Sequence, residues 1–354
     1  MMLTGPCILL GALLLDLLAG EAPNRFHPVA WLGKFISLQL RLVPAEGKVR
    51  QFTCGMAMVI LTTAMITVPL YLLICHCEAA AQLCHCEAAA QICHCEAAAQ
   101  ICHCEAAAAA AAICPITVNF PNLSTIAYIL FSIYLLKNTF SLRGLWQAVQ
   151  KVKMSLSNGD LAKARWHTNA LVSRKTENLS REQLISAAIE SCSENLCDSF
   201  VAPLFYFAIF GLPGAIAYRV VNTFDAMIGF HGKWEYTGKF AARLDDVLNF
   251  IPARLSGLLI VLASALRNAD FAGSWRTMLS QHGRTESPNA GWTMSAMAGS
   301  LGITLEKSGA YCLNGGGREL TLASITRSQQ ILIAAAAIWA MMVTGIEVLI
   351  GITA

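Results

Sequence analysis

Charged side chains are scarce in this sequence. Asp, Glu, Lys and Arg make up 13% of its 354 residues, apolar residues make up 56%, and the mean hydropathy is +0.54. Soluble domains carry about 25% charged residues, so this composition indicates a membrane protein. The formal net charge of +3 includes no long run of Lys or Arg. Binding to nucleic acid requires a basic patch, so we expect no nucleic-acid partner.

Several common catalytic patterns are missing. The glycines at 315–317 are not followed by G-K-[ST], so ATP, if it binds, does not bind through a Walker A loop. No Ser/His/Asp or Cys/His arrangement supports nucleophilic hydrolysis. Nine of the 14 cysteines lie between positions 75 and 114, and the other five form no C-x-x-C pair. We therefore assign those five cysteines no metal or redox chemistry.

Long apolar runs are abundant instead. Four of them approach the roughly 20 residues that cross a bilayer core, namely residues 3–19, 54–74, 123–136 and 331–352. The first run has no basic region before it and carries Asp16, so we interpret it as a mature helix and not as a signal peptide. These runs predict an all-α, polytopic integral membrane protein with a helical region on the cytoplasmic side.

Basic residues are distributed unevenly between these runs. The loop after the first run carries five Lys and Arg residues, the loop after the second carries none, and residues 137–165 carry six. Cytoplasmic loops are enriched in Lys and Arg, so the first loop and the central region are expected in the cytoplasm and both termini outside. We interpret residues 1–354 as one membrane domain, with a polar, motif-bearing region at 138–328.

Residues 75–112 repeat C-H-C-E-A-A-A-Q with a period of nine. The Cys-His-Cys triplets offer ligands that suit zinc or copper. A step of nine residues rotates a helix by about 900°, so successive triplets point to opposite faces. We favour a low-complexity insertion in an external loop, with metal binding as the alternative.

The apolar run at 201–221 is interrupted by G-L-P-G at 211–214. Gly and Pro at this spacing break a helix, so the sequence predicts two short helices joined by a turn and not one span. Such a hairpin keeps the polar residues before and after it on one side of the membrane. The run at 255–266 is too short for a span and is expected to pack beside the hairpin.

A helix is predicted to begin at Ser180, which can form a capping box with Gln183. Three carboxylates follow at four-residue intervals and share one helix face, with Asn195 at its edge: Glu190, Glu194 and Asp198. They form either a solvated acidic face or a site for Mg²⁺ held together with substrate phosphates.

Two more polar clusters lie beside apolar segments. The first has three polar residues on one helical side (Arg219, Asn222 and Asp225), and the next helix can pair Arg243 with Asp246 and Asp245 with Asn249. Arg254 can clamp a phosphate through its planar guanidinium. In a Ser-Pro-Asn turn, Ser287 and Asn289 can receive an anion. Plain salt bridges and a plain loop are the alternatives, and His27 is more simply an interfacial packing residue than a base.

Taken in chain order, these segments resemble one family, the CobD/CbiB proteins, which are adenosylcobinamide-phosphate synthases of cobalamin biosynthesis. The resemblance covers nearly the whole chain and is carried by L-D-L-L-A-G-E-A-P-N-R-F-H-P-V-A-W-L-G, S-R-K-T-E-N-L, A-A-I-E-S-C-S-E-N-L-C-D-S-F-V-A-P-L-F-Y, Y-R-V-V-N-T-F-D-A-M-I-G, A-R-L-D-D-V-L-N-F-I-P-A-R-L and S-P-N-A-G-W-T-M-S-A-M-A-G-S-L-G-I-T-L-E-K. One departure is Lys175, which stands where the family usually has an acidic residue. The repeat tract is also foreign to the family pattern.

The resemblance implies a carbon–nitrogen ligase in the inner membrane of a bacterial or archaeal cell, with its active site facing the cytoplasm. It would join adenosylcobyric acid to (R)-1-amino-2-propanol or its O-phosphate, with ATP and Mg²⁺ as cofactors. Its partners would be the corrinoid substrate, the aminopropanol, the lipid bilayer and other membrane enzymes of late cobalamin assembly, such as cobalamin synthase. A corrinoid membrane transporter and a non-catalytic membrane scaffold are the alternatives.

The resemblance also suggests roles for the polar residues. The expected metal ligands are Glu190, Glu194, Asp198 and Asp245. The expected catalytic residues are Glu194, Asp225 and Asp246. Substrate and phosphate binding is expected from Arg174, Asn195, Asn222, Arg243, Arg254, Ser287 and Asn289.

Overall fold

The computed structural model describes residues 4–21, 23–99, 123–172, 174–230 and 232–353, with side chains to position 75 in the long helix that ends at Ala99. The first half of the described chain contains α1 (Thr4–Ala19), α2 (Pro28–Gln39), the 3₁₀ turn η1 (Leu40–Leu42), α3 (Lys48–Ala99), α5 (Leu123–Lys137), α6 (Leu142–Ser157) and α7 (Leu161–Asn169).

The second half is also helical apart from one short hairpin. It contains α8 (Arg181–Leu196), the π-helical turn η2 (Cys197–Val201), α9 (Ala202–Ile228), α10 (Glu235–Leu248), α11 (Phe250–Leu266), α12 (Phe271–Gln281), the 3₁₀ turn η3 (His282–Arg284), α13 (Ala290–Leu301), the antiparallel strands β1 (Thr304–Lys307) and β2 (Tyr311–Asn314), and α14 (Leu322–Thr353). The predicted all-α fold class is confirmed.

Four helical segments of the described residues are long and apolar enough to cross a membrane: Lys48–Cys75, Thr125–Ser157, Arg181–Ile228 and Leu322–Thr353. The pair α10 and α11, bent by 50°, would make a fifth. The chain is therefore a multi-pass helical membrane protein. The predicted spans 54–74 and 331–352 fall within these segments, and 123–136 overlaps Thr125–Ser157. The predicted span 3–19 corresponds to α1, an apolar helix of 16 residues.

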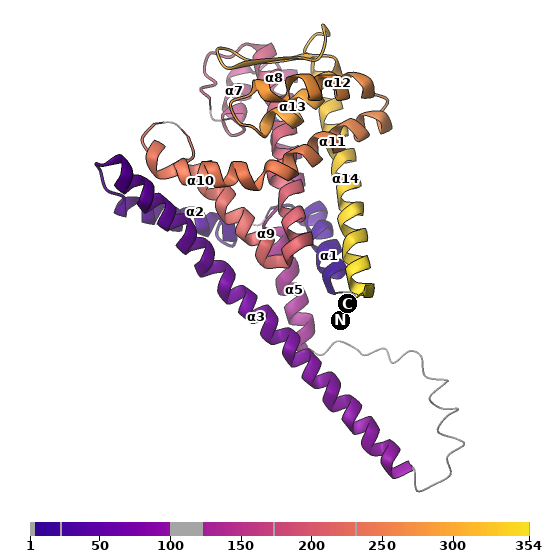
Figure 1. Ribbon diagram of the computed structural model, residues 1–354. Coiled ribbons are helices and arrows are strands. Elements are labelled where there is room, and N and C mark those ends of the chain that lie inside the picture. The colour runs from indigo at the N-terminus through magenta and orange to yellow at the C-terminus, as the bar shows by residue number, and fades with distance from the viewer. Residues whose placement is uncertain (1–3, 22, 100–122, 173, 231, 354) are drawn as a thin grey trace.

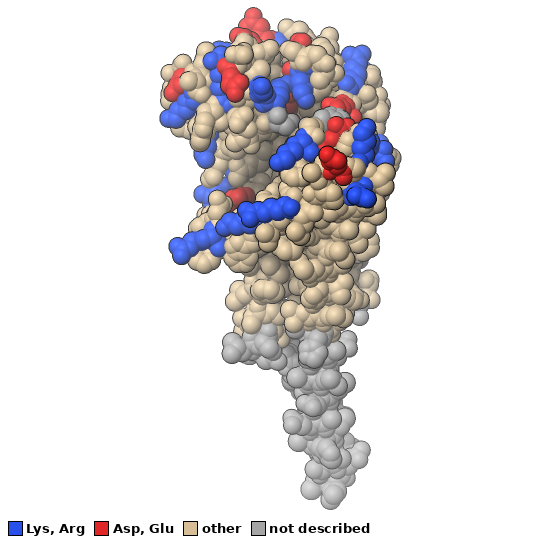
Figure 2. All heavy atoms as spheres, turned by 90° about the vertical axis from the view of Figure 1, so that its left-hand side faces the viewer, with Lys and Arg blue, Asp and Glu red and all other residues tan. Residues whose placement is uncertain are grey.

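Both termini lie at the same end of the molecule. Helix α1 packs against α5 and α14, whereas α7, α8, α12 and α13 gather at the opposite end (Figure 1). Lys, Arg, Asp and Glu concentrate toward that opposite end, and the tan surface below them is largely free of charge in this view (Figure 2). Most charged side chains thus lie toward the opposite end of the molecule from the two termini. The sidedness expected from the loop charges stays a prediction.

Helix α9 is a hairpin. Gly211 has φ 64° and ψ −160°, a conformation that is essentially restricted to glycine, and Pro213 follows it. The rings of Tyr206 and Tyr218 stack with their centroids 5.4 Å apart. In a continuous helix the 12-residue separation would place them about 18 Å apart. The predicted pair of short helices joined by a turn is therefore confirmed.

The helix that carries the first acidic face begins as predicted. The Ser180 side chain accepts a hydrogen bond from the backbone N–H of Gln183, and the Gln183 side chain accepts one from the Ser180 N–H. Helix α8 then widens into η2, which contains Asp198. Isolated π-helical turns recur at functional sites in proteins, because they redirect side chains within a helix.

Two apolar clusters form most of the core. The larger one joins α1, α5, α6, α8, α13 and α14, and the smaller one joins α2, α3, α9 and α10. A third set of buried residues lies between η2, α9 and α11, namely Cys197, Ala202, Tyr218 and Ala253. Helix α11 packs against η2, α13 and α14 and also touches α9, so the run expected beside the hairpin is in contact with it.

The repeat tract differs from its prediction where it is described. Helix α3 continues from the apolar span through the first repeats to Ala99, so this part is a helix and not a loop. Alanine and glutamate have high helix propensity, which favours continuation of the helix. The rest of the tract and its Cys and His side chains lie outside the described residues.

Candidate functional site

The beginning of the site is a hydrogen-bonded network around Glu190. Arg174 forms a 3.1 Å ion pair with this carboxylate, and Ser186 donates a hydrogen bond to it at 2.5 Å. Tyr311 of β2 donates its hydroxyl at 2.8 Å. Burial and the Glu190 charge raise the pKa of Tyr311, so its hydroxyl remains a donor. Glu190 is thus held by three partners and is buried.

A second network surrounds Asp245 on α10. Asn222 of α9 donates to Asp245 Oδ1 at 3.2 Å, and Asn249 donates to Oδ2 at 2.9 Å. Tyr218 in turn donates to Asn249 Oδ1 at 2.9 Å. The expected approach of Asp245 to Asn249 is confirmed, and the α9 hairpin supplies the other contacts.

Asp246 points toward a different element. The Ser287 hydroxyl donates to its carboxylate at 3.3 Å. The Asn289 amide donates to its carbonyl oxygen at 2.8 Å and to its carboxylate at 3.4 Å. The two residues predicted to bind a substrate anion thus donate to a carboxylate of the protein itself, and their role in substrate binding stays a prediction. The Asn289 Oδ1 atom is buried and has no hydrogen-bond partner.

The predicted arginines have three different environments. Arg174 is paired with Glu190, whereas the Arg254 guanidinium carbon lies 3.4 Å from the Phe250 ring centre and 4.8 Å from that of Trp292. Stacking of this kind orients the guanidinium plane. Arg243 is exposed and takes part in none of the ion pairs among the described residues, so the expected Arg243–Asp246 pair is wrong. Asp246 is satisfied by Ser287 and Asn289 instead.

The carboxylates converge from several elements. Asp198 of η2 lies within electrostatic range of Asp245, Glu194 and Asp225. Asp225 also interacts with Asp246. None of these five carboxylates forms a salt bridge in the part of the chain that the structure describes. Clustered negative charge of this kind is costly at a membrane protein's interior, so it indicates a functional site.

Arg219 is a cation at the edge of this cluster. Its Nη1 donates to Asn222 Oδ1 at 3.2 Å, and its Nε is buried without a hydrogen-bond partner. It lies within electrostatic range of Asp198 and Asp245. Asn195, by contrast, donates back to Ser191 of its own helix.

The predicted metal ligands do not form a preassembled cage. No group of three or more His, Cys, Asp or Glu side chains has a metal-holding arrangement among the described residues. Glu190 is already engaged by Arg174, Ser186 and Tyr311. Mg²⁺ rarely needs such a cage, because it commonly binds through one or two carboxylates together with substrate phosphates. Glu194, Asp198, Asp225 and Asp245 fit that mode of binding.

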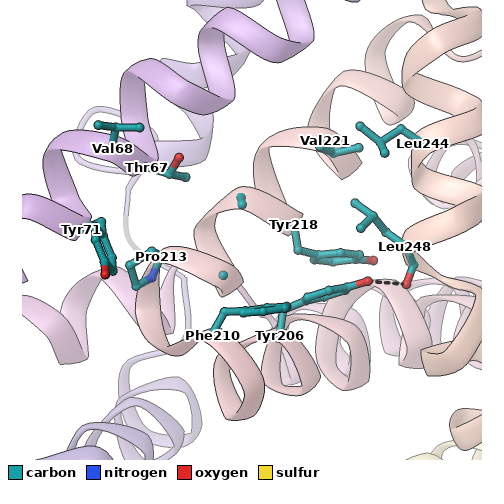
Figure 3. A pocket seen from close by; sticks show the side chains of 12 residues that line it. Thr67, Val68, Tyr71, Tyr206, Phe210, Pro213, Tyr218, Val221, Leu244 and Leu248 are labelled. Carbon is teal, nitrogen blue, oxygen red and sulfur yellow. Dashed lines mark hydrogen bonds between the residues drawn. The ribbon is translucent and has the colours of Figure 1, made fainter.

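A cavity of about 510 Å³ adjoins the Asp245 network from the apolar side. It lies between α3, α9 and α10, and Figure 3 shows the stacked rings of Tyr206 and Tyr218 in its wall. Tyr206 donates to the Leu248 carbonyl at 2.9 Å, which fastens the hairpin to α10. No carboxylate or cation lines this cavity, so we do not include it in the candidate site.

Sequence reasoning missed the residues that complete these networks. Ser186 and Tyr311 hold Glu190, and Tyr218 holds Asn249, yet none of the three was predicted. Tyr311 comes from a hairpin 121 positions from Glu190, and no local pattern connects them. For Ser186 a signal existed, since it lies four residues before Glu190 and hence on the same helix face.

The fold and the site define a multi-pass helical membrane protein with a cluster of unpaired carboxylates at one end of its helices. The family described as CobD/Cbib protein matches residues 9–103 and 97–341. The chain is 42% identical over 339 residues to "Cobalamin biosynthesis protein CobD" of Dehalococcoides mccartyi, with 96% of each chain covered. It is 38% identical to "Probable cobalamin biosynthesis protein CobD" of Methanothermobacter thermautotrophicus, with 86% of each chain covered.

A third relative is the "Probable cobalamin biosynthesis protein CobD" of Methanocaldococcus jannaschii, which is 33% identical over 88% of this chain and 89% of its own length. No solved structure matches the chain. The chain therefore belongs to the CobD/CbiB family of cobalamin biosynthesis proteins.

Proposed function

We propose that this protein is an ATP-dependent amide ligase that joins adenosylcobyric acid to (R)-1-amino-2-propanol or its O-phosphate. The observation that carries the proposal is the convergence of Glu194, Asp198, Asp225, Asp245 and Asp246, without ion pairs, in a chain of this family. Such a cluster suits a divalent cation carried by a nucleotide.

The reaction must activate a carboxylate, because a carboxylate anion and an amine do not condense in water. The corrinoid carboxylate oxygen attacks the γ-phosphorus of ATP, which forms an acyl phosphate and releases ADP. The amine nitrogen then attacks the acyl carbon, the carbon–nitrogen bond forms, and inorganic phosphate leaves. The amine arrives as an ammonium ion, so it loses one proton to a base before it attacks and a second proton when the amide forms.

The residues of the site supply the functions that these steps need. Mg²⁺, when bound with ATP, would neutralise charge on the transferring phosphoryl group. Asp225 and Asp245 are the ligands we assign to it, because α9 and α10 hold them close to Asp198 and Glu194. Arg219 adds a positive charge beside this cluster, since it lies within electrostatic range of Asp198 and Asp245.

Asp246 is the base that we assign to the amine. Its carboxylate is oriented by Ser287 and Asn289 and is only partly buried, so it can exchange a proton with solvent. Arg174 and Glu190 are positioning residues, because each neutralises the other and Tyr311 fixes their geometry.

The proposal includes a cellular setting. The site would face the cytoplasm of a bacterial or archaeal cell, where ATP is available, and the spans would lie in the cell membrane. Other membrane enzymes of late cobalamin assembly, such as cobalamin synthase, would consume the product.

Purified protein in detergent tests the reaction. Adenosylcobyric acid, the amine or its phosphate, ATP and Mg²⁺ should yield a product heavier by the condensed amine, detected by mass spectrometry, with one ADP released per product. Absence of any ATP-dependent product with Mg²⁺ or Mn²⁺ would overturn the proposal.

A transporter is the second candidate, because the broken helix α9 resembles the interrupted helices that transporters place at their substrate sites. Corrinoid uptake into proteoliposomes without ATP would favour it over the ligase. A scaffold would show neither uptake nor product.

A further inference from the structure

A second cavity is lined in part by Arg219, which also lies within electrostatic range of Asp198 and Asp245 of the carboxylate cluster. Its volume is about 220 Å³, and its polar lining consists of Glu21, Asn24, His27, Asn138, Ser141 and Arg219. These residues come from the loop between α1 and α2, from the chain after α5 and from α9. Drug-sized ligands occupy about 300–1,000 Å³, so this cavity suits a smaller molecule.

The cavity contains polar atoms that the protein leaves unpartnered. Asn138 is only 4% exposed, and its amide nitrogen donates to the Tyr134 carbonyl at 2.7 Å. Its Oδ1 atom is buried without a hydrogen-bond partner, as are the Ser141 hydroxyl and Arg219 Nε. Buried polar atoms are nearly always hydrogen-bonded in native proteins, so these atoms are available to a polar molecule that enters the cavity.

The charges in the cavity lie on opposite sides of it. The Glu21 carboxylate lies 3.6 Å from His27 Nε2, and burial lowers the pKa of His27, which favours the neutral imidazole. The absence of a side chain at Gly144 allows the Glu21 carboxylate and the Ser141 hydroxyl to approach each other. A Cβ at Gly144 would collide with the Ser141 hydroxyl and lie 3.0 Å from the Glu21 carboxylate. The Glu21 carboxylate and the Ser141 hydroxyl are therefore near neighbours.

A buried ion pair lies next to the cavity lining in the chain, and it adds no net charge to the cavity. Lys137 and Asp16 are both about 2% exposed and lie 3.7 Å apart. Lys137 is thus neutralised by Asp16, and Arg219 remains the cation of the cavity. The ligand therefore meets three acceptors, from Glu21, Asn138 and Ser141, and one cationic donor.

We propose that this cavity is the subsite for the amine substrate, a short amino alcohol that is either free or O-phosphorylated. An ammonium group has three donors and no acceptor, which matches the Glu21 carboxylate, Asn138 Oδ1 and the Ser141 hydroxyl. Arg219 Nε then takes the hydroxyl or phosphate oxygen. The inference rests on the proposed ligase function and adds a position for the amine.

The cavity is connected to the carboxylate site through hydrogen bonds. Arg219 donates to Asn222, and Asn222 donates to Asp245. A small molecule bound in this cavity with one end on Arg219 would therefore lie close to Asp245, which we assign to phosphoryl transfer. This proximity is what an intermediate that hydrolyses readily requires.

Steady-state kinetics of Glu21→Gln test the subsite. We expect its KM for the amino alcohol to rise at least tenfold, while the KM values for ATP and the corrinoid stay within twofold. Glu46→Gln, at an exposed position outside the cavity, is the matched control and should leave all three values unchanged. An unchanged KM for the amine in Glu21→Gln would overturn the inference.

A second variant shows whether a raised KM comes from the cavity itself and not from misfolding of Glu21→Gln. Ala30→Leu enlarges a side chain that lines the cavity and removes no polar atom, so it should raise the same KM by steric exclusion. Comparison of Arg219→Lys with both amines distinguishes the ligands, since a larger loss with the O-phosphate identifies the phosphate as the group that meets Arg219.

Calorimetric titration of the amine alone separates this inference from the ligase proposal. If the wild-type protein makes no amide but binds the amino alcohol, and Glu21→Gln does not bind it, the subsite stands and the ligase reaction fails. If the wild type is active and both cavity variants keep their KM for the amine, the subsite fails and the ligase stands.

Discussion

Tyr311 donates its hydroxyl to the Glu190 carboxylate at 2.8 Å, and the two residues are 121 positions apart in the chain. The contact joins the β hairpin to α8 and holds the carboxylate against Arg174. It therefore links the stability of the polar end of the molecule to the geometry of the site.

Tyr311→Phe should lower the free energy of unfolding by about 1.5–3 kcal/mol, the usual contribution of a hydrogen bond to a charged group. Because the folded-state pKa of Tyr311 is raised, its contribution is complete below the usual tyrosine pKa of about 10 and is lost as the pH rises through that value and onward to the folded pKa. The melting temperature should thus fall more steeply with rising alkaline pH for the wild type than for Tyr311→Phe. Equal slopes would contradict this account.

Asp245→Asn should abolish most of the activity without unfolding the protein. We expect a loss of about 100-fold or more in kcat, the scale of removing one preorganised electrostatic group. The melting temperature should stay unchanged, because relief of repulsion from Asp198 and Asp225 offsets one lost hydrogen bond. Exposed Glu319→Gln is the control. Full activity of Asp245→Asn would contradict the metal-binding role that we assign to Asp245.

Asn289→Ala should be more damaging than Ser287→Ala. Asn289 donates to Asp246 at both the carbonyl and the carboxylate of that residue and is 6% exposed, whereas Ser287 donates to Asp246 only once, at 3.3 Å, and accepts a hydrogen bond from the Asn289 N–H at 3.2 Å. Asn289→Ala should lower the free energy of unfolding by about 1–3 kcal/mol, because it leaves the partly buried Asp246 carbonyl without this donor. Denaturation and kcat of the two variants, measured side by side, check the order.

Gly211→Ala should destabilise the hairpin. The φ and ψ angles at this position are unfavourable for any side chain, and the cost of such strain is about 1–3 kcal/mol. Gly345 provides the matched control, since it is helical and a Cβ there meets nothing within 4 Å. Gly345→Ala should be neutral or slightly stabilising. Similar melting temperatures for the two variants would mean that the turn tolerates other geometries.

Local patterns were enough to predict much of the fold. Apolar length identified the spans, and the Ser180–Gln183 capping box identified the beginning of α8. The G-L-P-G break identified the turn in α9, because glycine and proline act through their own backbone geometry. These signals reside within a few residues of the feature that they predict.

The site required information that no local pattern contains. Arg243 and Asp246 have the spacing of a helical ion pair, yet Asp246 turns to Ser287 and Asn289, more than 40 positions away. Periodicity gives the face of a helix on which a side chain lies, but the packing of α10 against the turn before α13 decides its partner. The assigned roles in metal and substrate binding remain predictions.

The hairpin in α9 has a consequence for how the chain is threaded through the bilayer. Its two arms enter and return, so together they add an even number to the count of crossings. A topology reporter fused at Asp198 and one fused at Asp225 would then report the same side of the membrane, although the 26 residues between them are mostly apolar. Integration of this hairpin into the membrane therefore does not change the side of the membrane on which α10 begins. A change in the length of the repeat tract that preserved the span of α3 would not change that side either.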